Sequence, residues 1–231
     1  MSKVLRNFLA WGFILAVSGP AFARQPPSRA PEPALLLPKI TVHVYNYARV
    51  PHRTLARAGH EARRLFLKVP IETEWLDSQV SESERPGITL CEHSLGPAHV
   101  VVNILPYSVA EGFESHDDDL GVALVPVDGD FGSCAYIFYS RIKDSAHRTG
   151  VGEMSLLAYT LAHEVGHLLL GLNSHSATGL MSGKWSLKDL QSVECGRLDF
   201  TLLQSEHIRT AALVRNRRGS SIIVAAGESR K

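Results

Sequence analysis

Hydrophobic and polar positions alternate along several short stretches of the chain. Residues 40–47, with the sequence ITVHVYNY, alternate and are rich in β-branched and aromatic side chains, which predicts a strand with one buried face. Residues 98–105 form a continuous apolar run of the length of a fully buried strand. Together, these patterns predict about five strands, at residues 40–47, 71–76, 98–105, 121–127 and 134–142.

A helical period replaces this alternation in three longer stretches. Residues 50–69 carry apolar side chains at helical spacing, and Pro51 lies near the start, where its missing N–H removes no hydrogen bond. Residues 156–172 are almost entirely apolar, and Gly171 is of the type that most often ends a helix. Residues 201–213 are expected to form a final helix, and the order of elements predicts an α+β fold.

Polar residues interrupt the apolar helix predicted at residues 156–172. His163, Glu164 and His167 follow the spacing H-E-x-x-H. Since residues four apart lie on the same helix face, both imidazoles can bind one metal ion, with the carboxylate of Glu164 beside it. Such groups are costly to bury unless they are paired or bind a metal. The pattern therefore predicts a hydrolytic zinc site with Glu164 as the general base.

A catalytic zinc site usually takes a third protein ligand and leaves a position open for water. The helix is expected to end at Gly171, and the short turn that follows carries His175 back toward the helix face. His175 is therefore the first candidate for the third ligand.

The segment HEVGHLLLGLNSHSATGLM, residues 163–181, resembles the zinc signature of the metzincin metallopeptidases and is most similar to the matrixin branch. The resemblance implies a zincin fold with a mixed twisted sheet, an active-site helix, a tight Met-turn and a C-terminal helix. It implies zinc bound by His163, His167 and His175. It also implies that Glu164 is the base, that Gly171 turns the chain, and that Met181 lies beneath the metal.

The spacing after His167 departs from the family pattern. The usual glycine comes three residues after the second histidine and the last histidine six after it, whereas here Gly171 comes four after and His175 eight after. Strict counting would place Asn173 at the third-ligand position, and an amide is a poor zinc ligand. A helix and a turn that are each one residue longer would still deliver His175. The alternative ligand is an acid after Met181, with Glu194 first.

The N-terminal residues predict export. Lys3 and Arg6 precede the apolar run 8–17, and residues 21–23, Ala-Phe-Ala, form a cleavage signal, so residues 1–23 are expected to be a secretory signal peptide. Residues 24–38 form a proline-rich leader, residues 39–217 the folded domain and residues 218–231 a flexible tail. We expect a secreted or periplasmic protein without stable membrane insertion after cleavage.

The number of cysteines predicts a disulfide, and the net charge argues against nucleic acid as a partner. For an exported chain with three cysteines, one disulfide and one free thiol is the most economical expectation. Cys91 and Cys134 flank strand-like segments and are the first candidate pair, although the sequence does not determine the pairing with Cys195. Cleavage of the signal peptide moves the formal net charge from +1 to −1, which gives no electrostatic case for binding nucleic acid.

These observations favour a monomeric zinc metalloendopeptidase acting on peptides or proteins. The alternative is a non-catalytic secreted protein whose zinc site serves folding or partner binding. Several other polar and aromatic residues are expected to have structural or surface roles: His43, His52, His60, Asp117, Asp118, Asp119, Tyr136, Tyr139, Trp185 and His207.

Overall fold

The computed structural model describes residues 36–78, 91, 95–112, 116, 118–127 and 131–228, the last seven by their backbone alone. The signal peptide expected at residues 1–23 and nearly all of the leader expected at 24–38 lie outside the described residues, as does Asp117. The residues from Leu36 onward belong to one compact unit. In the described part of the chain, no helix combines the length and apolar character that crossing a bilayer requires.

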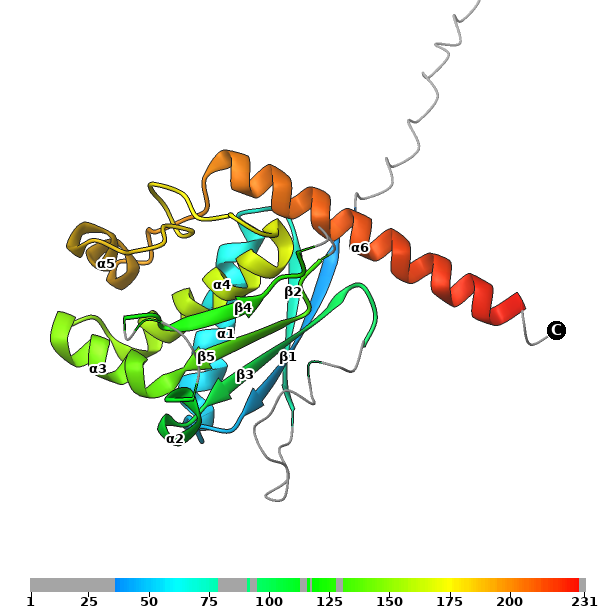
Figure 1. The fold of residues 1–231 in the computed structure, drawn as a ribbon. Helices are drawn as coiled ribbons and strands as arrows, with labels where there is room; N and C mark the ends of the chain where they lie inside the picture. The colour runs from blue at the N-terminus through cyan, green and yellow to red at the C-terminus, as the bar shows by residue number, and fades with distance from the viewer. Residues whose placement is uncertain are drawn as a thin grey trace, which may run out of the picture. The chain divides into compact units, whose positions relative to one another are not determined.

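Five strands form one mixed sheet with the order β2-β1-β3-β5-β4 (Figure 1). The strands are β1 (Lys39–Asn46), β2 (Glu72–Ser78), β3 (His99–Leu105), β4 (Gly121–Leu124) and β5 (Cys134–Phe138). Strand β1 runs parallel to β2 and β3, and β3 runs parallel to β5, whereas the edge strand β4 pairs antiparallel with β5. The predicted α+β fold with a mixed sheet of about five strands is confirmed.

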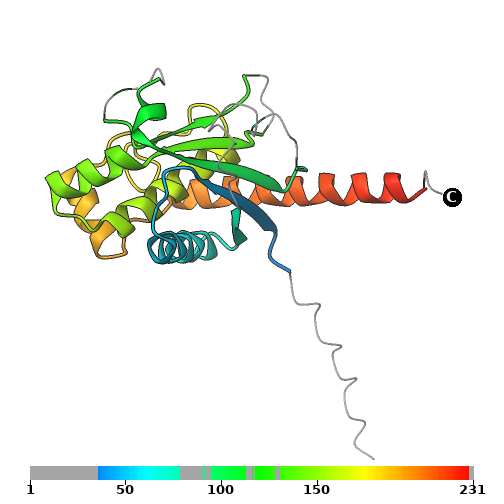
Figure 2. The same cartoon turned by 90° about the horizontal axis from the view of Figure 1, so that it is seen from below.

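The two faces of the sheet are covered differently. Helices α1 (His52–Leu67) and α4 (Glu153–Leu170) pack on one face, where Ile40, Val42 and Val44 of β1 join the main core (Figure 1). The short helix α2 (Tyr107–Ala110) lies on the opposite face with a smaller apolar cluster (Figure 2). Strand β3 contributes to both clusters, which explains its continuous apolar run.

Four helices differ from the sequence prediction, and the first of them, α2, was not predicted. Strand β5 ends at Phe138 and α3 (Tyr139–Thr149) follows at once, although we expected a strand to residue 142. Tyr139 and Ile142 are buried three residues apart on α3, but the preceding apolar run hides the change of period. Helix α5 (Leu187–Glu194) was not predicted, and a capping box formed by Ser186 and Asp189 marks its start.

The last helix, α6 (Leu202–Glu228), extends beyond the predicted end at residue 213. The flexible tail expected from residue 218 is helical as far as Glu228, so that expectation was wrong over this range. Gly219 costs this helix about 1 kcal/mol relative to alanine, a penalty too small to end it.

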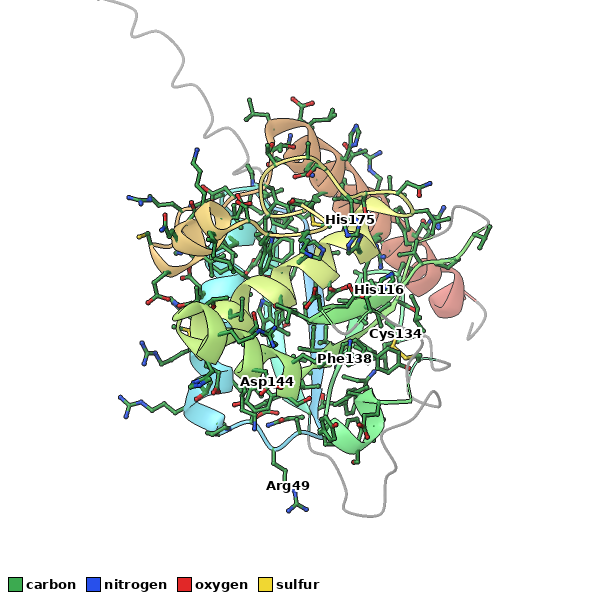
Figure 3. The ribbon with its side chains drawn as sticks, turned by 60° about the vertical axis from the view of Figure 1, so that its left-hand side comes forward. Arg49, His116, Cys134, Phe138, Asp144 and His175 are labelled. Carbon is green, nitrogen blue, oxygen red and sulfur yellow. A yellow bond between two sulfur atoms is a disulfide. The ribbon has the colours of Figure 1, made fainter. Side chains whose placement is uncertain are left out.

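One disulfide joins Cys91 to Cys134 at the start of β5 (Figure 3), and Cys195 is a free, exposed cysteine. This confirms the predicted pairing. The link ties Cys91 to the sheet face opposite α1 and α4.

Candidate metal site

Helix α4 is the central support of the site. Its residues are buried on almost every side, as expected for an apolar helix enclosed by a sheet and other helices. It ends at Gly171, whose φ of +86° lies in the region that favours glycine. The sequence prediction that this helix carries His163 and His167 and ends at Gly171 agrees with the structure.

The structure brings His163, His167 and His175 together. The Nε2 atom of His167 lies 3.0 Å from Nε2 of His163 and 3.0 Å from Nε2 of His175. One nitrogen from each ring lies within 4.8 Å of the others, and among the described residues this is the only such group of three. Figure 3 shows His175 beside α4. Two nitrogens bound tetrahedrally to one zinc ion would lie about 3.3 Å apart, so the spacing fits a single ion.

Hydrogen bonds fix the two helical rings from behind. Nδ1–H of His163 donates to the carbonyl oxygen of Leu180 at 2.8 Å, and Nδ1 of His167 bonds the hydroxyl of Ser174 at 2.6 Å. Since a carbonyl oxygen only accepts, the proton of His163 is held on Nδ1 and the lone pair of Nε2 faces the cluster. Such partners behind the ligands are typical of histidines that bind metals.

Burial keeps both helical imidazoles neutral. It lowers the pKa of His163 to about 4, with a smaller contribution from the charge of His175. It also lowers the pKa of His167 to about 3, with help from the two neighbouring histidines. A neutral imidazole is the form that binds a metal, so no proton must leave these rings at neutral pH.

The turn after Gly171 delivers the third histidine. Asn173, at the position that strict counting selects, has a φ of +55°, which turns the chain back toward α4. The N–H of Ser176 then bonds the carbonyl of Met181 at 2.9 Å, which closes the loop that carries His175. Gly183 underlies the ring of His175, because a Cβ there would lie 3.1 Å from Nδ1. Residues before and after His175 in the loop therefore determine its position.

The alternative ligand lies elsewhere. A carboxylate oxygen of Glu194 accepts a hydrogen bond from the N–H of Gly152 at 2.8 Å, at the N-terminal end of α4. This end of the helix is roughly 16 Å from His163 along the axis, at 1.5 Å per residue. The structure thus brings His175, and not Glu194, to the helical histidines.

Glu164 lies between α4 and the edge strand β4, and its residue is only 5% exposed. A Cβ at Gly121 would lie 2.8 Å from Cγ of Glu164, so this glycine makes room for the carboxyl group. None of the described residues donates a hydrogen bond to it. Burial raises the pKa of Glu164 to about 8, and the negative charge of Asp119 adds to the shift. A buried carboxyl group beside three converging imidazoles is an arrangement suited to proton transfer.

Met181 is fully buried under the helix. A Cβ at Gly166 would lie 2.6 Å from Sδ of Met181, so the absent side chain allows the turn to approach α4 closely. The role of Met181 beneath a metal and the metzincin assignment both stay predictions.

Comparisons with known proteins are distant. No protein-family model matches the chain, and no curated protein matches it significantly. Among solved structures, the chain is similar to a zinc-dependent peptidase from Methanocorpusculum labreanum, with a TM-score of 0.46 and 12% identity, over 72% of this chain and 99% of that one. It is also similar to archaemetzincin from Methanopyrus kandleri, with a TM-score of 0.46 and 16% identity, over 75% and 95%. Likenesses this remote transfer neither a family nor an activity to the chain.

Apart from Asp119, whose negative charge raises the pKa of Glu164, the described residues that we expected to have other roles make no ring contact or hydrogen bond with the three histidines, with one exception. The rings of His43 and His99 bond each other at 2.9 Å on the far face of the sheet, and Tyr139 donates to Glu153. His52, His60, Asp118 and His207 are exposed. The exception is Trp185, whose ring lies 5.8 Å from that of His163.

Sequence reasoning missed Ser174, Gly121, Gly183 and the role of Trp185. Ser174 precedes His175 directly, so its place in the turn was a usable signal. The two glycines are recognised only through the side chains of Glu164 and His175 that occupy the space beside them.

Proposed function

We propose that this chain is a zinc-dependent metallopeptidase that hydrolyses peptide bonds. The observation that carries the proposal is the convergence of three Nε2 atoms at a helix that also carries the buried carboxyl group of Glu164, to which no described residue donates. Imidazole nitrogens suit zinc, and three protein ligands leave a position open for the reaction. A zinc ion that only stabilises the fold would not need a buried carboxyl group that accepts no hydrogen bond from the described residues.

Glu164 serves as the general base and then as the general acid. Zinc, when bound by His163, His167 and His175, lowers the pKa of a water molecule to about 7 and polarises the scissile carbonyl group. Glu164 takes the proton from the attacking water and delivers it to the leaving amine. Burial raises the pKa of its carboxyl group above the ordinary range, which favours this group as a proton acceptor.

Strand β4 is the proposed binding edge for the peptide. Among the described strands it is the last of the sheet and pairs only with β5, and a Cβ at its first residue, Gly121, would lie 2.8 Å from Cγ of Glu164. A peptide lying extended along this edge would pair with its main chain and pass the carboxyl group of Glu164.

A peptide-library experiment tests the proposal. The zinc-loaded chain without residues 1–23 is incubated with a diverse library, beside the variants Glu164→Gln and Glu206→Gln. Glu206 is an exposed glutamate of α6, so its variant controls for the loss of one charge. We expect cleavage by the wild type and by Glu206→Gln, and a loss of about 100- to 10,000-fold in Glu164→Gln with zinc retained. Zinc-loaded folded protein that cleaves nothing would instead support a non-catalytic zinc-binding protein.

We also propose that the protein is exported to the periplasm or the medium, with residues 1–23 as its signal peptide. The charged start, the apolar run and the Ala-Phe-Ala sequence support this, and so does the Cys91–Cys134 disulfide, since such bonds persist in oxidising compartments. N-terminal sequencing of the mature protein should begin at Arg24. A mature chain that still begins at Met1 would contradict export by cleavage.

A further inference from the structure

Trp185 lies on the segment that follows Met181, beside the proposed zinc site. Its side chain is half-buried. The ring meets that of His163 edge to face, at 5.8 Å between centroids and 86° between planes. It meets the ring of Tyr159 in the same way, at 6.5 Å and 86°. Tyr159 is fully buried on α4, one helical turn before His163, so Trp185 contacts the face of the helix that carries the ligand.

One carbonyl oxygen links Trp185 to the first histidine. The indole Nε1–H of Trp185 donates to the carbonyl oxygen of Leu180 at 3.1 Å. The same oxygen accepts the Nδ1–H of His163 at 2.8 Å. A carbonyl oxygen has two lone pairs, so both donors can be satisfied at once.

Both backbone polar groups of Leu180 are thereby held. Its N–H donates to the carbonyl of Asp199 at 2.9 Å, and its carbonyl oxygen is held by Trp185. The orientation of this carbonyl determines which nitrogen of His163 carries the proton and how the ring lies. A change in the carbonyl would therefore move the Nε2 lone pair away from the cluster.

We infer that Trp185 is a positioning residue, which fixes the Leu180 carbonyl and through it the tautomer and orientation of His163 for metal binding. The identity of the metal as zinc rests on the proposed function. The contacts of Trp185 do not depend on that identity. No sequence pattern points to this role, because the three groups meet only through the fold of the turn.

Zinc affinity measures this role directly. The dissociation constant is obtained by competition with a chromophoric chelator for the wild type, Trp185→Phe and Trp185→Leu. Trp75→Phe is the matched control, because Trp75 on β2 also donates one indole hydrogen bond, to Oγ1 of Thr73 at 2.9 Å, at the opposite edge of the sheet. Losing a direct partner of a ligand typically weakens binding by about 10- to 100-fold. Trp185 acts through one further group, so we expect a loss of about 3- to 10-fold for Trp185→Phe.

Trp185→Leu removes the ring contact as well and should lose about 10- to 100-fold, whereas Trp75→Phe should bind zinc as the wild type does. The visible spectrum of the cobalt-loaded protein, which reports ligand geometry, should change in Trp185→Phe and not in Trp75→Phe. If Trp185→Leu does not fold, Trp185→Phe decides the matter alone.

Two results would contradict the inference, and they differ in whether the wild type binds zinc. Equal zinc affinity and equal cobalt spectra for Trp185→Phe, Trp75→Phe and the wild type, with similar losses in thermal stability, would show that Trp185 only packs. A wild type that binds no zinc would overturn the proposed function, and this inference with it.

Discussion

The candidate site has two halves that are built in different ways. One half, His163 and His167, lies on a buried helix, with each ring held from behind by a hydrogen bond. The other half, His175, lies on an exposed turn, and its ring rests against Gly183, which has no side chain. The helical half is fixed by a repeating backbone geometry, whereas the other depends on the path of one loop.

This difference indicates that the helical half is arranged for metal binding in advance, whereas His175 can adjust its position. The helical rings are neutral and already point at a common centre, so they need little rearrangement to bind a metal. His175 can adjust, because a turn tolerates changes in length that a helix does not. A loop that is longer than the family pattern can therefore still supply the third ligand.

Replacing the two kinds of ligand should separate the halves most clearly. His167 lies between the other rings, at 3.0 Å from each, so His167→Ala removes the centre of the cluster. We expect it to weaken zinc binding by far more than the roughly 100-fold upper range for losing an outer partner. His175→Ala leaves the helical pair intact and should keep weak binding. Titration with a competing chelator measures both, and equal losses in the two variants would show that the halves are equivalent.

The buried groups of α4 also predict how the stability of the metal-free protein depends on pH. The folded state depresses the pKa of His163 and His167, so between their ordinary pKa of 6.5 and about 4 the unfolded chain binds more protons. The stability that their neutral forms provide is therefore lost as the pH falls below 6.5. Glu164 has a raised pKa, so its contribution is present below 4.5 and is lost as the pH rises toward about 8.

Stability should consequently be greatest near pH 6.5, with a slope of about 1.4 kcal/mol per pH unit for each proton of difference. Urea unfolding of the metal-free protein from pH 4 to pH 9 measures the profile. The variant Glu164→Gln is the control and should lose the decline on the alkaline side. An unchanged decline in that variant would show that another group causes it.

Local geometry explains which parts of the site could be predicted from the sequence. His163 and His167 are one helical turn apart, and Gly171 is a common helix-ending residue. Both features can therefore be predicted from the sequence without knowing the fold. His175 needed a guess about the turn, which the structure supports. Trp185, Gly121 and Gly183 act through groups that are distant along the chain or on another element, and no periodic pattern records such contacts.

The same limit applies to the fold. Strands and helices with a clear period were predicted within a few residues. Helix α3 was missed because the apolar residues 134–139 continue through the point where strand becomes helix. The order of the strands was also beyond sequence reasoning, since β1 pairs with β3 across a separation that periodicity cannot reveal.

Ser174 provides a test of how the turn supports the helix. Its hydroxyl bonds Nδ1 of His167 at 2.6 Å, so the turn holds a ligand of the helical half. Ser174→Ala should weaken zinc binding by about 10- to 100-fold, as expected for a direct partner of a ligand. Ser192→Ala is the control, because the hydroxyl of Ser192 donates to the carbonyl of Lys188 within α5. Chelator competition that finds no loss in Ser174→Ala would show that the two halves are independent.

The smallest expected effects come from two glycines, one in each half. Gly166 on α4 lies against Met181, where a new Cβ would come within 2.6 Å of Sδ, so Gly166→Ala should lower stability by about 1–3 kcal/mol through overpacking. Gly183→Ala would press on the ring of His175 at 3.1 Å, a contact that the exposed turn can partly relieve. It should change stability little and weaken zinc binding by only a few-fold. Urea unfolding and chelator competition on both variants measure the contrast. The helical half should respond as a packed core and the turn as an adjustable ligand, and a large stability loss in Gly183→Ala would show that the turn is as rigid as the helix.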